Sequence, residues 1–248
     1  MYFCNIKHIK LIKTLNSNMK RIVFLTGAGM SAESGISTFR DSDGLWENYS
    51  VEEVCTHEAW LRQPEVCLNF YNMLRRKFKD CKPNEGHKLV AALQDKYDVQ
   101  VITQNVDNLH EQAGAKNVLH LHGELMKCRP EGYDQGVYYP LDPENPDIKM
   151  GDVDSHGVQL RPHIVFFGED VPNLSRAADI METADIVVVI GTSLNVYPAA
   201  SLLRYAPSKA PIWLIDPKPV FSPYREVTQI QKGASEGMKE LDKILRGL

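Results

Sequence analysis

The sequence lacks the features of a disulfide-bonded secreted protein and of a membrane protein. It contains five cysteines, an odd number, and no two of them form a C-x-x-C pair. A disulfide framework requires paired cysteines, so free thiols in a reducing, cytoplasmic compartment are favoured. No apolar run is long enough to cross a bilayer, and we therefore expect no membrane partner.

The sequence also lacks a strong charge of either sign. Its formal net charge is -4, and no basic stripe marks a surface for nucleic acid, so we expect no nucleic-acid partner. Residues 1–18 contain no acidic residue, but Lys7, Lys10 and Lys13 interrupt the apolar core that a signal peptide needs. We predict that residues 1–18 form a disordered extension, with Met19 as an alternative start, and that residues 19–248 form the folded domain. A short basic arm that contacts a partner is the other interpretation.

The apolar residues of the chain predict an α/β fold. They make up 43% of 248 residues, enough for one large domain with a smaller lobe. Short apolar runs predict buried parallel strands at 22–25, 98–102, 184–190 and 211–216, and amphipathic patterns predict helices at 51–78, 87–94 and 238–245. The fold class is therefore a Rossmann-like, doubly wound parallel sheet. Proline, glycine and tyrosine interrupt residues 126–160, which predicts a smaller inserted lobe formed from about 41–80 and 126–160.

A glycine turn follows the first predicted strand. Gly27, Ala28 and Gly29 allow close approach of a ligand to the backbone, and Ser31 to Glu33 are expected to open a helix whose free N–H groups face the turn. The spacing Gly27-x-Gly29-x-x-Ala32 fits a dinucleotide fingerprint. Residues 38–46 are polar and do not resemble the second strand of a hydride-transfer domain. The pattern therefore indicates chemistry on the dinucleotide itself.

Polar side chains follow three other predicted strands. Gln104, Asn105 and Asp107 suit a ribose and a nicotinamide amide, although an Asx turn that caps the next helix is an alternative, and Asp107 can do both. Residues 191–193 (Gly-Thr-Ser) suit a phosphate or ribose, and Asp216 suits the adenosine ribose. These positions place a binding site at one edge of the sheet.

One further predicted strand, 118–125, contains two histidines of the same parity. His122 ends the run before a glycine and is a candidate general base. His120 is interpreted as a hydrogen-bonded structural histidine. Residues 161–169 predict a strand with an exposed edge that an extended peptide can pair with, or else an ordinary core strand.

Several motifs in one order resemble those of the sirtuins, the NAD-dependent protein deacylases. They are GAGMSAESGISTFR, TQNVDNLHEQAG, LHGEL, RPHIVFFGE and GTS, and the resemblance extends from Met19 to the C-terminus. The most similar sirtuins are the bacterial members grouped with succinyl- and glutaryl-lysine deacylases.

The resemblance implies a role for each matching residue. His122 is the general base, and Asn105 is the second catalytic residue. The implied NAD-binding residues are Gly27, Ala28, Gly29, Ser31, Ala32, Phe39, Arg40, Gln104, Asn105, Asp107, Gly191, Thr192, Ser193, Asp216 and Ala234. The implied substrate-binding residues are Tyr71, Arg75, Val165, Phe166 and Gly168.

The resemblance also implies the reaction. The acyl oxygen of a modified lysine attacks the ribose carbon that bears nicotinamide, nicotinamide leaves, and His122 takes a proton from a ribose hydroxyl whose oxygen attacks the imidate carbon. Lysine, nicotinamide and O-acyl-ADP-ribose result. The cofactor is NAD, the substrates are acylated-lysine proteins, and the enzyme is expected to be a monomer. The alternatives are a mono-ADP-ribosyltransferase or NAD glycohydrolase, and a non-catalytic NAD sensor, against which the joint presence of His122 and Asn105 argues.

The sequence departs from the family pattern in two places. Sirtuins usually hold a structural zinc with two pairs of cysteines, whereas residues 126–160 offer only Cys128 and His156, so we predict no zinc and a lobe held by packing around Tyr133, Tyr138, Tyr139 and Leu141. The acidic-acyl deacylases have a tyrosine and, three residues later, an arginine. Tyr71 matches the tyrosine, but Leu74 replaces the arginine and Arg75 follows it. This favours a deacetylase, with desuccinylation left open.

Overall fold

The large lobe is built on a six-stranded parallel sheet. A computed structural model describes residues 19–36, 49–132 and 136–247. The strands are β1 Arg21–Thr26, β2 Asp98–Thr103, β3 Val118–His120, β7 Ile186–Ile190, β8 Ile212–Ile215 and β9 Thr228–Ile230. Their order is β3-β2-β1-β7-β8-β9 and every neighbouring pair is parallel. The chain therefore runs outward from β1 in one direction and from β7 in the other, which opens a crevice at their carboxyl ends.

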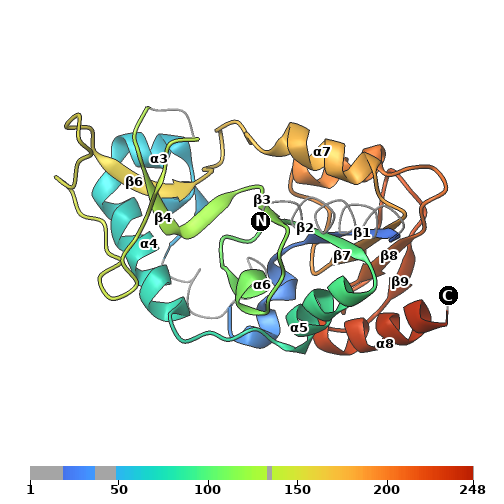
Figure 1. Ribbon diagram of the computed structural model, residues 1–248. Helices are drawn as coiled ribbons and strands as arrows, with labels where there is room; N and C mark the ends of the chain where they lie inside the picture. The colour runs from blue at the N-terminus through green and yellow to red at the C-terminus, as the bar shows by residue number, and fades with distance from the viewer. Residues whose placement is uncertain (1–18, 37–48, 133–135, 248) are drawn as a thin grey trace, which may run out of the picture.

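Helices cover both faces of this sheet (Figure 1). α5 (Glu85–Ala92), the short helix η3 (Leu93–Asp95) and α8 (Ala234–Arg246) pack on one face, while α7 (Leu174–Glu182) and η4 (Ala199–Tyr205) pack on the other. Because successive side chains of a strand point to opposite faces, Ile22 and Phe24 of β1 enter the first core, and Val23 and Leu25 enter the second. This arrangement confirms the predicted doubly wound, Rossmann-like α/β fold.

A small lobe lies beside the sheet, at the left of Figure 1. It combines a three-stranded antiparallel sheet with three helices. The strands are β4 Gly123–Pro130, β5 Tyr139–Pro140 and β6 Leu160–Ile164, and the helices are α2 Val51–Val54, α3 His57–Arg62 and α4 Pro64–Phe78. Strands and helices share one apolar core that includes Phe70, Leu125 and Phe166.

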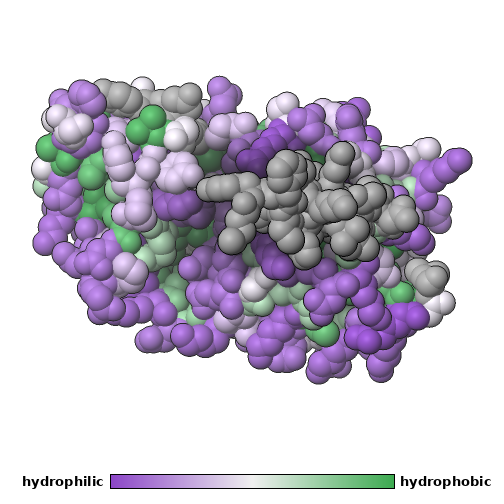
Figure 2. All heavy atoms as spheres, viewed as in Figure 1, coloured by the Kyte–Doolittle hydropathy of each residue, from purple (hydrophilic) through white to green (hydrophobic). Residues whose placement is uncertain are grey.

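The residues proposed to pack the small lobe only partly do so. Leu141 packs against its core, but Tyr138 and Tyr139 are 45% and 41% exposed, and Tyr133 lies outside the described residues. Helix α4 supplies more of the core than any other single element of the lobe, since five of its apolar side chains are buried there. Apolar surface also gathers over this lobe on the face shown in Figure 2.

Several predicted elements are divided by tertiary contacts or caps. The single helix expected at 51–78 is three helices, since Thr56 caps α3 by accepting from Ala59 N, and Pro64 begins α4. The single strand expected at 118–125 is also wrong: β3 ends at His120 in the large sheet and β4 begins at Gly123 in the small one.

The helix expected to open at Ser31–Glu33 is wrong as well. Two single-turn 3-10 helices, η1 (Ala28–Met30) and η2 (Ala32–Ser34), follow the glycine turn instead, and left-handed Gly35 ends the second. The expected anion site at an α-helix N-terminus is therefore not formed by these residues. The helix expected after the Asx turn at Asp107 is α6 (Leu109–Gln112), whereas the sequence patterns do not predict α7 or strand β9.

The segment 161–169 contains an edge strand, as the first interpretation expected. β6 occupies one edge of the small sheet, and the chain beyond it forms a bridge between Phe167 and Thr56. No helix within the described residues combines the length and apolar character that a membrane span requires. Residues 1–18 lie outside the described part of the chain.

Candidate active site

The loops after β1 and β7 interlock at the centre of the crevice. Gly27 N donates to Ile190 O at 3.0 Å, and Gly29 N donates to Gly191 O at 2.9 Å. A Cβ added to Gly29 would lie 2.7 Å from Gly191 Cα, closer than any real side chain is found. The glycines of the dinucleotide-like motif are therefore required first for the contact between these two loops.

Ser31, Asn105 and Asp107 form one hydrogen-bonded group beside this contact. The Asn105 amide donates to Gly27 O and to Ser31 Oγ, both at 3.1 Å, and Ser31 Oγ donates to Asp107 Oδ2 at 3.0 Å. Asp107 Oδ1 accepts from Leu109 N at 3.1 Å, so the predicted cap at the start of α6 is confirmed. Burial raises the pKa of Asp107 and outweighs these two hydrogen bonds.

The remaining predicted residues of the large lobe surround the same crevice. Gln104 Nε2 donates to Thr192 Oγ1 at 3.2 Å and so links the loops after β2 and β7. Asp216 is buried directly after β8 and accepts from Lys218 N at 2.9 Å. Ala234 is the first residue of α8, where Ser235 N donates to the Glu33 carboxylate at 3.2 Å.

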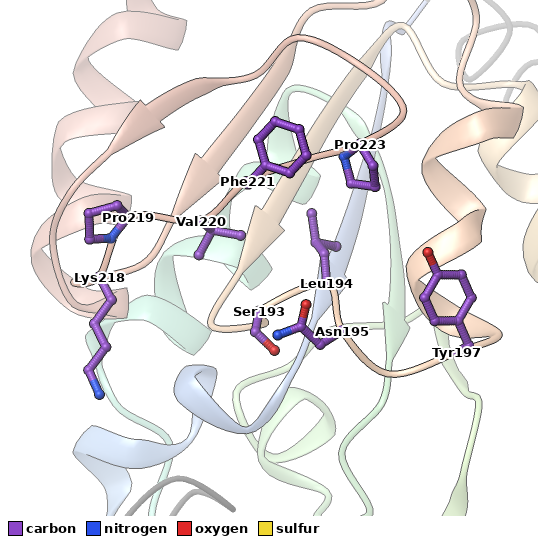
Figure 3. A pocket seen from close by; sticks show the side chains of 9 residues that line it. All are labelled: Ser193, Leu194, Asn195, Tyr197, Lys218, Pro219, Val220, Phe221 and Pro223. Carbon is purple, nitrogen blue, oxygen red and sulfur yellow. The ribbon is translucent and has the colours of Figure 1, made fainter.

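A cavity of about 450 Å³ opens beside Ser193 (Figure 3). Its walls come from the loop after β7 and from the loop after β8, and include Tyr197, Lys218 and Phe221. Sequence analysis did not single out these last three residues. The only signal was their position a few residues beyond two predicted strand ends, which does not distinguish them from ordinary loop residues.

His122 lies at the junction between the lobes, between β3 and β4. Its Nδ1 lies 3.0 Å from Gln104 O. A carbonyl can only accept, so the proton is on Nδ1 and the Nε2 atom is the basic nitrogen. Burial lowers the pKa of His122, and this effect outweighs the hydrogen bond to the Gln104 carbonyl, which raises the pKa. The residue after His122 must be a glycine. The backbone of β6 passes so close to Gly123 that an added Cβ would lie 2.0 Å from His163 O.

His120 is hydrogen-bonded on both ring nitrogens, as the structural interpretation expected. Nδ1 lies 2.9 Å from Asn105 O, and Nε2 lies 2.8 Å from Glu111 Oε1. Burial alone would lower the pKa of His120, but the hydrogen bond and charge of Glu111 raise it above its ordinary value. Both histidines therefore hold consecutive carbonyls of the loop after β2.

The small-lobe residues that are expected to bind substrate lie next to His122. Val165 N donates to His122 O at 3.0 Å, which fixes the segment 165–168 next to that histidine. Phe166 is buried, and its ring centroid lies 5.6 Å from that of Tyr71. The Tyr71 hydroxyl donates to Cys55 Sγ at 3.6 Å, so this side of the crevice is apolar.

Arg75 is placed differently from Tyr71, although both lie on α4. Its Nε donates to Leu125 O at 2.8 Å, and its Nη1 donates to Asn72 Oδ1 at 2.6 Å. Asn72 in turn exchanges two hydrogen bonds with the backbone of Ile148. Among the described residues, these contacts direct Arg75 into the small lobe and none joins it to the segment 165–168. Leu74 is buried in the lobe core.

The structure thus brings together the predicted residues of both lobes around one crevice, except in two respects. Arg75 points into the small lobe, and Phe39 and Arg40 lie outside the described residues. In the part of the chain that the structure describes, no three His, Cys, Asp or Glu side chains are grouped closely enough to hold a metal ion.

A family model decides the identity of this fold and crevice. The model of the Sir2 family matches residues 27–198, which include the loops after β1, β2 and β7 and the His122 junction. The chain belongs to the Sir2 family. Relatives in this family include the NAD-dependent protein deacylase of Bacteroides thetaiotaomicron, 54% identical over 92% of this chain and 98% of the relative. The NAD-dependent protein deacylase of Helicobacter pylori strain 26695 is 49% identical over 81% and 86%.

Solved structures of Sir2 proteins agree with this fold. A Sir2 homologue in complex with NAD superposes with a TM-score of 0.81 at 38% identity, covering 96% of this chain and 94% of its own. A mutant Sir2 homologue in complex with ADP-ribose gives 0.82 at 38% identity, covering 96% of both chains. The crevice of this chain contains carboxylate, carboxamide and hydroxyl groups, which include Asp107, Gln104 and Thr192.

Proposed function

We propose that this chain, an NAD-dependent protein deacylase, transfers the acyl group of modified lysine side chains in proteins to ADP-ribose. The observation that carries the proposal is the position of His122. Its ring is oriented by Gln104 O on the nucleotide side, and its carbonyl accepts from Val165 N on the substrate side. A base with one hydrogen bond to each side suits a reaction that joins an acyl group to a nucleotide.

The crevice residues are proposed to hold NAD along the carboxyl ends of the strands. NAD, when bound, supplies the ribose carbon that receives the acyl oxygen and the nicotinamide that leaves. Asn105, Asp107 and Ser31 are already joined by hydrogen bonds at 3.0 and 3.1 Å, which supports a fixed set of polar groups for the nicotinamide ribose and carboxamide. Gln104 is proposed to belong to the same nicotinamide set. Gly191, Thr192, Ser193, Asp216 and Ala234 are proposed to hold the adenosine half of NAD. The other residues proposed to bind NAD are Gly27, Ala28, Gly29 and Ala32, together with Phe39 and Arg40, which lie outside the described residues.

His122 is proposed to accept the proton of a ribose hydroxyl at Nε2. Two observations support this: the Gln104 carbonyl keeps the other proton on Nδ1, and burial lowers the pKa of His122, so the ring is neutral near pH 7. A positioned base of this kind contributes about 10²–10⁴-fold in rate. We therefore expect His122→Ala to bind NAD and remain folded but to lose turnover by that factor.

The acyl chain is proposed to be neutral, as in acetyl-lysine. Val165, Phe166, Gly168 and Tyr71 are assigned to the acyl-lysine channel. The Tyr71 hydroxyl is bonded to a thiol, and the neighbouring Leu74 is buried and apolar, so neither of these two positions offers a cation to an acyl carboxylate. Arg75, the other substrate residue expected from the sequence, is bonded to Asn72 and Leu125. We infer that Arg75 supports the lobe instead.

Mass spectrometry of reactions with NAD and matched acetyl-, succinyl- and unmodified lysine peptides tests the proposal. We expect O-acetyl-ADP-ribose from the acetyl peptide, at least tenfold more than the succinyl product. His122→Ala should abolish it, while His156→Ala, at an exposed position of the small lobe, should not. Leu74→Arg should raise turnover of the succinyl peptide relative to the acetyl peptide. Nicotinamide release without an acyl product from any peptide would support a transferase or glycohydrolase instead.

We propose that the small lobe needs no zinc. Cys55, Cys67 and Cys128 are buried in its apolar core, and among the described residues no three His, Cys, Asp or Glu side chains are grouped as a closed zinc site requires. The bonds of Asn72 to the Ile148 backbone connect α4 to the long β5–β6 connection without a metal. Elemental analysis should find less than 0.1 zinc per chain, and EDTA should leave the melting temperature unchanged. One zinc per chain would refute this.

The working form is proposed to be a cytoplasmic monomer that acts on acylated proteins. The free thiols of Cys55, Cys67, Cys81 and Cys128 suit a reducing compartment. Light scattering after gel filtration should give the mass of one chain, 28.1 kDa. A concentration-independent dimer would contradict the monomer.

A further inference from the structure

Residues 166–169 form a turn that Glu169 closes twice. Glu169 N donates to Phe166 O at 3.0 Å, and the Glu169 carboxylate accepts from Phe166 N at 2.8 Å. Gly168, the third residue of the turn, has φ of 92°, which a type II turn requires at this position and which glycine adopts without strain. The backbone and the side chain of Glu169 therefore both bond to the backbone of Phe166, and together they close the turn.

Three groups from other parts of the chain hold the carboxylate itself. Arg161 Nη1 donates to Glu169 Oε1 at 2.7 Å, Arg129 Nη2 lies 3.4 Å from Oε2, and His57 Nδ1 lies 2.9 Å from Oε1. The side chains of Arg161 and Arg129 are 1% and 4% exposed, so water screens these interactions little. Burial would raise the pKa of Glu169, but the hydrogen bond and charge of Arg161 lower it, so the group stays ionised.

The same cluster contacts the ring of Phe166. The Arg161 guanidinium lies over the Phe166 ring, 4.1 Å from its centroid. On the other side of the turn, Phe167 N donates to Cys55 O at 2.8 Å, and His57 N donates to Phe167 O at 3.0 Å. The turn is thus fixed on both sides, and its conformation depends on one buried carboxylate.

We propose that Glu169 is a positioning residue for the acylated substrate. It holds the segment 165–168 in the conformation that receives acyl-lysine, and it does so without contacting the substrate or NAD. The inference rests on the proposed function, which assigns this segment to the acyl-lysine channel. A residue with this role affects peptide binding and leaves NAD binding unchanged, whereas a residue that only stabilises the fold affects both.

The test compares Glu169→Gln with a matched control, Glu131→Gln. Glu131 accepts from the same Arg161 nitrogen at 3.1 Å, but it is 28% exposed and makes no described contact with the turn. We expect Glu169→Gln to raise the KM for acetyl peptide at least tenfold, with the KM for NAD within twofold of wild type. Glu131→Gln should leave both constants within twofold.

A milder variant covers the case in which Glu169→Gln does not fold. His57 has a half-buried side chain, and His57→Ala leaves both arginines on the carboxylate. We expect a rise of about threefold in peptide KM and none in NAD KM. Thermal unfolding of each variant identifies those that are folded.

Direct binding separates this inference from the proposed function. Fluorescence anisotropy with a labelled acetyl-lysine peptide gives a Kd that needs no turnover. A wild type that binds the peptide but makes no O-acetyl-ADP-ribose refutes the proposed reaction, and the Kd values of the variants still test Glu169. Folded Glu169→Gln and His57→Ala proteins with the Kd of wild type overturn the inference, as does an equal loss of NAD and peptide affinity.

Discussion

Two buried histidines beneath the crevice make the stability of this protein sensitive to acid. His87 of α5 is completely buried, and neither of its ring nitrogens has a partner among the described residues. Its ring packs against that of His110, with centroids 4.8 Å apart, and the Nε2 atom of His110 lies 3.2 Å from Thr26 Oγ1. Burial lowers the pKa of His87 from 6.5 to about 4, because it outweighs the opposing charge of Glu111.

The size of the effect follows from this shift. A histidine with a lowered folded pKa stabilises the fold fully above pH 6.5, and this stability is lost as the pH falls toward 4, because the unfolded chain binds the proton first. A shift from 6.5 to about 4 corresponds to about 3 kcal/mol in all, of which ~2 kcal/mol is lost between pH 7.5 and pH 5.0. His87→Leu removes the titrating group and leaves an apolar side chain of similar size.

Urea unfolding at pH 7.5 and pH 5.0 measures this difference. We expect the free energy of unfolding of wild type to fall by ~2 kcal/mol more than that of His87→Leu over this interval. Val90→Ala is the matched control, because Val90 is equally buried in the same helix and does not titrate. It should lower stability by the same amount at both pH values. If His87→Leu and wild type lose equal stability, the assignment of acid sensitivity to His87 is wrong.

Three further predictions concern other parts of the site. The value of kcat/KM should rise with pH through a midpoint below 6.5 and then level off, because burial lowers the pKa of His122, and a pH–rate profile tests this. Asn72→Ala should lower the free energy of unfolding by about 2–4 kcal/mol in urea titrations, since the Ile148 backbone and Arg75 Nη1 lose their buried hydrogen bonds to Asn72. Gly123→Ala should abolish activity and lower the melting temperature, because its Cβ would overlap His163 O.

The large sheet could be predicted from sequence because its strands are buried on both faces. A strand such as β7 then consists only of large apolar residues and ends at a glycine, and the polar groups that follow such strands must meet at one edge. This reasoning located Asn105, Asp107 and Asp216 correctly in space. It depends on strand order only weakly, since all carboxyl ends of a parallel sheet lie together.

The points at which a predicted strand or helix is split into separate elements could not be predicted in the same way. The run 118–125 passes from one sheet to another because β6 pairs with Gly123. The paired residues, Gly123 and Ile164, are 41 positions apart in the sequence. The Glu169 cluster likewise depends on His57, 112 residues away. Local periodicity contains no information about such partners, so the sequence predicted the motif 161–169 without the carboxylate's role.

The connection between the lobes explains why the candidate base lies where it does. Backbone hydrogen bonds attach His122 to the small lobe: Val165 N donates to its carbonyl, and Gly123 pairs with Ile164 directly after it. The residue before it is attached to the large lobe, because Leu121 N donates to Thr103 O at 2.9 Å. The ring also faces the large lobe, where Nδ1 lies 3.0 Å from Gln104 O. This carbonyl holds the proton on Nδ1 and leaves Nε2 as the basic nitrogen, so the tautomer of the candidate base is set by contacts at the junction of the two lobes.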